Sequence, residues 1–265
     1  MSYTSTRPLL VFLHYWGGSS STWHKVISLA KEEYPILSLD LRGWGQSFCP
    51  DDPTAYSISI MADDVAGTLE KMADERQTSL DNGFILVGHS MGGKVALATI
   101  PALSDRIRGK LHSLVLVAPA PPTPLKLPGE IQEQQQKAYA TEESVVWNIR
   151  HILANMENLS AADVEMIVRD SLSGHEWAKK AWPSYGMQED ITDSVARALS
   201  SLQAKKQITA KILVGGSDLV EPRERVESGV ARFLQENGVK VSLRVVEGVK
   251  HLLPLECPKV VYEMI

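Results

Sequence analysis

Short apolar runs bounded by turn residues recur along the chain. Most of these runs are apolar on both alternating faces, which is typical of strands that helices cover on both sides. Segments of helical period lie between them, for example Val65, Leu69 and Met72 at spacings of four and three residues. This alternation predicts an α/β protein with a mainly parallel sheet. The candidate strands lie at residues 9–13, 36–39, 84–87, 114–117, 212–214 and 241–246.

The alternation breaks once, between residues 119 and 204, where we find no convincing strand. The segment opens with a proline-rich stretch and continues as a polar helical pattern with scattered aromatic residues. Because so long a stretch is not a simple connection, we predict an inserted helical cap at residues 121–204. The sheet core then comprises residues 1–120 and 205–265. Ligands of open α/β sheets bind at the carboxyl ends of the strands, where we expect the cap to lie.

The composition is that of an ordinary globular protein of 265 residues with a net charge of −5. Without an excess of Lys and Arg, nucleic acid is not an expected partner. The sequence contains no run of 18 apolar residues, so we predict no membrane span. The N-terminal region lacks the pattern of a signal peptide. Cys49 and Cys257 lie in unlike contexts without metal-ligand spacing, which indicates free thiols in a reducing compartment. We therefore expect a cytoplasmic protein, whose oligomeric state the sequence does not indicate.

The sharpest local signal is the sequence GHSMG at residues 88–92, between a predicted strand and a predicted helix. A tight turn of this kind holds its central residue in a strained backbone state with its side chain exposed. A side chain at Gly88 or Gly92 would clash with the turn. Ser90 is thus the candidate nucleophile. The alternative is that Ser90 only caps the following helix.

A serine hydroxyl needs a base within hydrogen-bond reach, itself oriented by an acid. Of the seven histidines, His251 alone follows the last predicted strand. Asp218 follows the preceding strand, so nucleophile, acid and base occur in the order expected for such a turn. Glu221 is the weaker alternative for the acid, and the alternative role for Asp218 is that of a turn-forming residue after its strand. An oxyanion also needs two N–H donors, which we expect from the backbone of Met91 and from the loop at residues 13–20.

Taken together, these motifs resemble the α/β-hydrolase superfamily. The segment DLRGWGQS at residues 40–47 is similar to the D-x-R-G-x-G-x-S loop of that superfamily, and residues 218–222 and 251–258 are similar to its acid and histidine segments. The resemblance covers approximately residues 8–120 and 207–265. It implies that the backbone N–H of Trp16 is the second oxyanion donor. It also implies an α/β-hydrolase fold with helices on both faces of the sheet.

The chain departs from the family pattern in two places. Tyr15 stands where the family usually has glycine, so its phenol is a candidate substrate contact. The first predicted strand follows only eight residues, too few for the antiparallel hairpin that usually precedes it. The resemblance therefore implies an abbreviated sheet of about six strands, similar to that of plant methylesterases and hydroxynitrile lyases.

These features predict a serine hydrolase of a small carboxylic ester or lactone that needs neither cofactor nor metal. The same three side chains also serve cofactor-free perhydrolases or haloperoxidases and carbon–carbon bond hydrolases, and a ligand receptor can retain them. Further possible substrate contacts are His89 in the turn and Trp147, Trp177 and Trp182 in the cap. Aromatic residues at such spacing more often pack helices together than touch a substrate.

Overall fold

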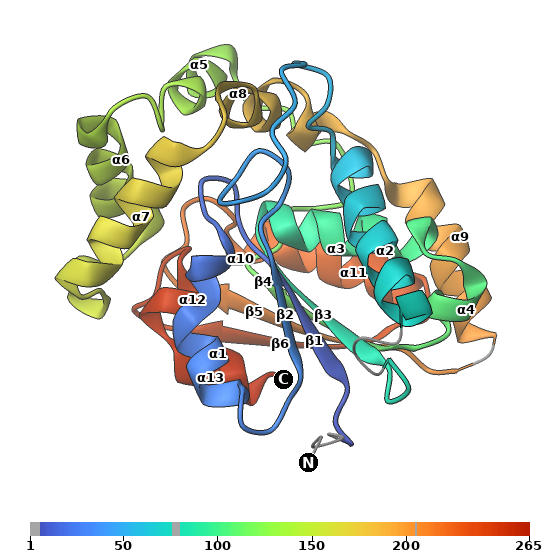
Figure 1. The fold of residues 1–265 in the computed structure, drawn as a ribbon. Coiled ribbons are helices and arrows are strands. Elements are labelled where there is room, and N and C mark those ends of the chain that lie inside the picture. The colour runs from blue at the N-terminus through green and yellow to red at the C-terminus, as the bar shows by residue number, and fades with distance from the viewer. Residues whose placement is uncertain (1–5, 76–79, 205) are drawn as a thin grey trace.

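A computed structural model describes residues 6–75, 80–204 and 206–265. Its centre is one sheet of six strands in the order β2-β1-β3-β4-β5-β6, in which every neighbouring pair is parallel (Figure 1). The parallel sheet of about six strands expected from the sequence is confirmed. The strands are β1 (Leu9–Leu13), β2 (Ile36–Leu39), β3 (Phe84–His89), β4 (Leu111–Val117), β5 (Thr209–Gly215) and β6 (Lys240–Val246).

Both faces of the sheet are covered, which explains the unbroken apolar runs. In β1, Leu9, Val11 and Leu13 pack into one core cluster, whereas Leu10 and Phe12 pack into a second one on the other face. Burial of each such side chain contributes about 1.5–3 kcal/mol. Helices α2, α3, α9 and α11 lie on the first side, and α1, α12 and α13 lie on the second (Figure 1).

The helices outside the segment between β4 and β5 are α1 (His24–Ala30), α2 (Ile58–Glu75), α3 (Met91–Ala102), α4 (Asp105–Arg108), α10 (Arg223–Val226), α11 (Arg232–Glu236), α12 (Leu253–Glu256) and α13 (Pro258–Glu263). A π-helical turn, Glu227–Ala231, joins α10 to α11. No helix in the described part of the chain is long and apolar enough to cross a membrane.

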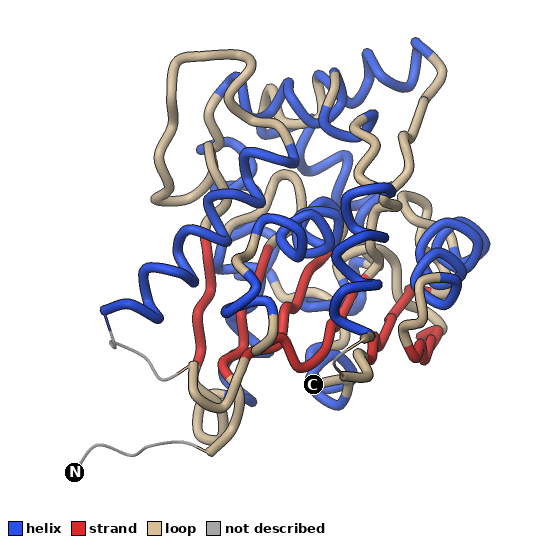
Figure 2. The backbone as a smooth tube through the Cα atoms, turned by 90° about the vertical axis from the view of Figure 1, so that its right-hand side faces the viewer, coloured by secondary structure: helices blue, strands red, loops and turns tan. Residues whose placement is uncertain are grey.

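Between β4 and β5 the described chain is helical, as its hydrophobic pattern predicts. Helices α5 to α8 lie beyond the carboxyl ends of the strands, and α9 returns along the sheet (Figures 1 and 2). The arrangement of this segment as a separate cap with the boundaries given above stays a prediction. The helices are α5 (Gly129–Gln136), α6 (Glu142–Asn148), α7 (Ala161–Ser173), α8 (Glu176–Ser184) and α9 (Thr192–Gln203), with a π-helical turn at Ile149–Leu153.

Candidate active site

Ser90 occupies the turn between β3 and α3. Its backbone has φ 55° and ψ −117°, a conformation that costs free energy for a residue with a side chain. The Ser90 side chain makes no capping hydrogen bond to α3. Ser90 thus stands at the N-cap position of α3, but its hydroxyl does not cap the helix and is left for another role.

The glycines on either side of Ser90 have a steric cause. A Cβ atom on Gly88 would lie 2.4 Å from the carbonyl oxygen of Gly92, and one on Gly92 would lie 2.4 Å from that of Leu13. These neighbours are backbone atoms and have no freedom to rotate away. The close approach brings the start of α3 against the end of β1, which sets Ser90 beside the loop that follows β1.

His251 and Asp218 meet although they follow different strands. His251 Nδ1–H donates a hydrogen bond to Oδ2 of Asp218 at 2.8 Å, and both side chains are buried. The other carboxylate oxygen, Oδ1, accepts the backbone N–H groups of Val220 and Glu221 at 2.8 and 3.0 Å. The orientation of Asp218 is thus fixed from both ends of its carboxylate. Glu221, the alternative acid, contributes its backbone and not its carboxylate.

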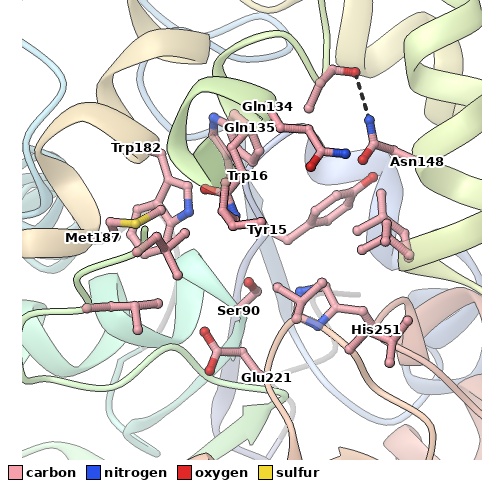
Figure 3. Close-up of a pocket in the computed structure, with 18 of the residues that line it drawn as sticks. Tyr15, Trp16, Ser90, Gln134, Gln135, Asn148, Trp182, Met187, Glu221 and His251 are labelled. Atoms are coloured by element: carbon pink, nitrogen blue, oxygen red, sulfur yellow. Dashed lines mark hydrogen bonds between the residues drawn. The ribbon is translucent and has the colours of Figure 1, made fainter. Parts of the chain in front are cut away.

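The environment of His251 sets its protonation. Burial by itself lowers its pKa, but the charge of Asp218 and the hydrogen bond to it raise the pKa above the usual value of 6.5. With Nδ1 engaged, Nε2 is the nitrogen that is left to act on a neighbour. Ser90 and His251 line the same cavity and lie side by side there (Figure 3), with no hydrogen bond between their side chains in the described structure.

His89 supports the His251 loop instead of lining the cavity. Its Nε2–H donates to the carbonyl oxygen of His251 at 2.8 Å, and its side chain is fully buried. Burial holds the pKa of His89 well below the usual value, so the ring is neutral. The expectation that His89 contacts substrate is therefore corrected: the residue lies behind the site. The N–H of His251 donates to Leu153 at 2.9 Å, which ties the same loop to the segment between β4 and β5.

The loop after β1 is held by a neutral histidine. His14 Nδ1–H donates to the carbonyl oxygen of Tyr15 at 2.7 Å, and Nε2 accepts the N–H of Leu41 at 2.9 Å. Burial lowers the pKa of His14 to about 4, which matches this pair of bonds. The hydroxyl of Tyr139 donates to the carbonyl oxygen of Trp16 at 2.8 Å. The assignment of the Trp16 and Met91 N–H groups as oxyanion donors stays a prediction.

Ser90 and His251 open onto a cavity of about 350 Å³. Tyr15 and Trp16, from the loop after β1, form part of its wall (Figure 3), and Tyr139 lines it next to Trp16, with the two ring centroids 4.3 Å apart. The cavity is mainly apolar with a few polar groups, as small-molecule sites usually are. Its apolar lining includes Leu125, Leu127, Ile131, Ile152, Trp182 and Met187. Its polar lining includes Gln134, Gln135, Asn148 and Glu221.

Of the three tryptophans named above as possible substrate contacts, only Trp182 lines this cavity. Trp147 is 43% exposed and stacks on His151. Trp177 donates its Nε1–H to Asp51 at 2.9 Å. Neither residue is among those that line the cavity. Among the described residues, no cluster of His, Cys, Asp and Glu could hold a metal ion.

Glu221 is the site residue whose place the sequence did not predict. Its side chain is only 2% exposed, yet it lines the cavity beside Ser90 (Figure 3). Burial raises the pKa of this carboxyl to about 8. The only signal in the sequence was the position of Glu221 three residues after Asp218, in the loop that also carries the acid.

The chain combines a parallel sheet and a serine turn with a buried histidine–aspartate pair at the strand ends. These features together define a class of hydrolases. Residues 10–264 match the Alpha/beta hydrolase family. The chain belongs to this family.

Individual relatives include esterases. Pimeloyl-[acyl-carrier protein] methyl ester esterase of Aeromonas hydrophila is 34% identical over 114 residues, which are 43% of this chain and 39% of that protein. The chain thus matches less than half the length of this curated relative. An esterase from Thermogutta terrifontis superposes with a TM-score of 0.72 at 23% identity, over 98% of this chain and 88% of that one. A bromoperoxidase from Bacillus anthracis superposes with a TM-score of 0.75 at 18% identity, over 97% of this chain and 90% of that one. The two solved structures indicate a shared fold.

Proposed function

We propose that the protein is a serine hydrolase that cleaves small carboxylic esters or lactones through an acyl-enzyme. The observation that carries the proposal is the 2.8 Å hydrogen bond from His251 to Asp218 at the cavity that Ser90 lines. The esterase among the partial sequence relatives supports the same reaction class. In this proposal Ser90 is the nucleophile, His251 the base and Asp218 the acid.

In the first half-reaction, Ser90 Oγ attacks the carbonyl carbon while Nε2 of His251 takes the hydroxyl proton. Asp218 stabilises the imidazolium that forms and keeps Nε2 directed at the nucleophile. The tetrahedral intermediate then collapses: the bond to the alcohol oxygen breaks, and that oxygen takes the proton from Nε2. The alcohol leaves, or stays attached if the substrate is a lactone, and the acyl group remains on Ser90.

In the second half-reaction, water gives a proton to Nε2 and attacks the acyl carbon. Collapse breaks the bond to Ser90, which recovers its proton from His251, and the carboxylic acid leaves. The negative oxygen in both intermediates needs preorganised donors, which we assign to the backbone N–H groups of Met91 and Trp16. The hydrogen bond from Tyr139 to the Trp16 carbonyl supports this assignment, because it fixes the peptide next to the proposed donor.

The segment at residues 121–204 acts as the cap in this proposal and determines which acyl groups enter. Support comes from its residues in the cavity wall, among them Leu127, Trp182 and Met187. A cavity of about 350 Å³ suits small substrates better than long lipids. Cys49 and Cys257 are free thiols, which supports a cytoplasmic location.

The proposal is tested with p-nitrophenyl esters of graded acyl length and a set of lactones, assayed with the wild type and with Ser90→Ala. We expect turnover of short acyl groups by the wild type and a loss of at least about a thousandfold in Ser90→Ala. Ser200→Ala on α9 is the matched control, because Ser200 is exposed, and it should behave as the wild type. Full activity in Ser90→Ala contradicts the proposal. A single burst followed by almost no turnover points instead to a ligand receptor.

A further inference from the structure

Glu221 presents to the cavity a carboxyl group that has no part in the proposed hydrolysis. Its side chain is 2% exposed, and Oε2 has no hydrogen-bond partner in the described chain. In Figure 3 the carboxyl group lies beside Ser90, on the side away from His251. A buried polar group without a hydrogen-bond partner destabilises the folded protein. A carboxyl kept at such a place therefore points to a ligand that supplies the missing partner.

The neighbours of Glu221 satisfy its carboxyl group only in part. Asp218 already holds His251, and Glu221 reaches Asp218 only through its backbone N–H. The nearest cation is Arg225, whose Nη1 lies at ion-pair distance, 3.5 Å from Oε2, and also donates a hydrogen bond to the carbonyl oxygen of Val220 at 2.8 Å. An apolar side chain would fill the same space without the desolvation cost.

Burial keeps the carboxyl neutral near pH 7 in spite of the surrounding charges. Arg225 on α10 and His251 favour ionisation, Asp218 opposes it, and Lys94 on α3 also interacts with Glu221. Burial outweighs these charges and raises the pKa of Glu221 to about 8. A neutral carboxyl both donates and accepts a hydrogen bond, so it suits a neutral polar group.

We propose that Glu221 determines specificity by binding a keto or hydroxyl substituent that the substrate carries close to its scissile carbonyl. This inference rests on the proposed ester hydrolysis and names its substrate class: short keto- and hydroxy-esters. A cationic substituent fits less well because Arg225 lies 3.5 Å from the same oxygen. An anionic substituent would be opposed by Asp218, whose charge already acts on Glu221. The apolar wall, with Leu127 and Met187, receives the alkyl part.

The test compares three ethyl esters of the same chain length: ethyl butanoate, ethyl 3-hydroxybutanoate and ethyl 3-oxobutanoate. Each kcat/KM is divided by the rate of hydroxide hydrolysis of that ester, which removes intrinsic reactivity. We expect the wild type at pH 7 to prefer both substituted esters by about five- to tenfold, the worth of one hydrogen bond. Glu221→Leu should lose this preference, whereas Glu221→Gln, which keeps a donor and an acceptor, should retain most of it. Glu224→Gln on the exposed side of α10 is the matched control and should keep the preference.

The pH dependence separates a substrate contact from a structural role. As the pH rises through about 8, Glu221 loses the proton that it donates to a keto oxygen. The preference for the keto ester should therefore fall in the wild type and stay constant in Glu221→Gln. The preference for the hydroxy ester should persist, because a carboxylate still accepts the hydroxyl proton.

Three outcomes decide between the hypotheses. Equal preferences in wild type and Glu221→Leu, together with an inactive Ser90→Ala, overturn the role of Glu221 and leave the proposed hydrolase intact. A wild type that shows no preference for the substituted esters likewise overturns the role of Glu221 and leaves the proposed hydrolase intact. Turnover by Ser90→Ala, or none of any ester by the wild type, overturns the proposed function and the role of Glu221 with it.

Discussion

The imidazole Nδ1 of His251 lies 2.8 Å from Oδ2 of Asp218, although 33 residues separate them in the chain. Because the carboxylate accepts this proton, the neutral imidazole carries its hydrogen on Nδ1 and keeps a lone pair on Nε2. A base of this tautomer beside a serine hydroxyl is what acyl transfer requires.

Replacing Asp218 by Asn should lower kcat by roughly 10³–10⁴-fold. The amide is nearly the same size but carries no charge to stabilise the imidazolium, and it can select the wrong imidazole tautomer. Steady-state kinetics with a short p-nitrophenyl ester measures the effect. Asp193→Asn on the exposed surface of α9 is the matched control and should retain wild-type kcat. A loss below tenfold in Asp218→Asn would exclude Asp218 as the acid.

Activity should rise with pH along a single ionisation of His251. The charge of Asp218 and its hydrogen bond outweigh burial and raise the pKa of His251 above 6.5, and only the neutral ring accepts a proton from Ser90. Half-maximal kcat/KM is therefore expected above pH 6.5. In Asp218→Asn the residual activity should reach its half-maximum at lower pH. A profile that does not move between the two proteins contradicts the assignment.

The same group links stability to pH. A raised pKa means that the folded state binds the proton of His251 more tightly than the unfolded state. Its contribution to the free energy of unfolding is therefore complete below pH 6.5 and is lost as the pH rises through the folded-state pKa. Urea unfolding of the wild type and His251→Gln across this range should show a difference that shrinks with rising pH, and a difference that grows would refute it.

Adding one methyl group at Gly92 should destabilise the fold by about 3 kcal/mol or more. The new Cβ would meet backbone carbonyl oxygens of Leu13 and His14 at 2.4 and 2.5 Å, which neither side can relieve by rotating a side chain. Gly67→Ala is the matched control: it lies within α2, nothing lies within 4 Å of its added Cβ, and it should stabilise by about 0.5–1 kcal/mol. Equal urea midpoints for the two variants would contradict the close approach.

The strand ends and the turn could be predicted from the sequence because their signals are local. Gly88 and Gly92 flank Ser90 at fixed spacing, and the apolar runs of the strands show where each strand ends. In a parallel sheet the carboxyl ends share one edge, so residues after different strands meet without further information. The meeting of His251 with Asp218 follows from this geometry.

The cavity wall could not be predicted in the same way. Which face of a helix meets the cavity depends on how the helices pack, and Trp147, Trp177 and Trp182 have no distinguishing pattern in the sequence. The place of His89 also differed from the prediction: the alternation of side chains along β3 directs its ring behind the site and not into the cavity. In the sequence, Glu221 was only the alternative to Asp218 as the acid. Its burial beside Ser90 identifies it as a cavity residue.

The most direct test of the central claim is mass spectrometry of the protein after reaction with a p-nitrophenyl phosphonate, which traps a nucleophilic serine as a stable adduct. The account predicts one adduct per chain, on the peptide that contains Ser90. It also predicts no adduct in Ser90→Ala and a much slower reaction in His251→Ala, which retains the hydroxyl but lacks the base. An adduct on another residue, or undiminished labelling of Ser90→Ala, would contradict the claim that Ser90 is the nucleophile.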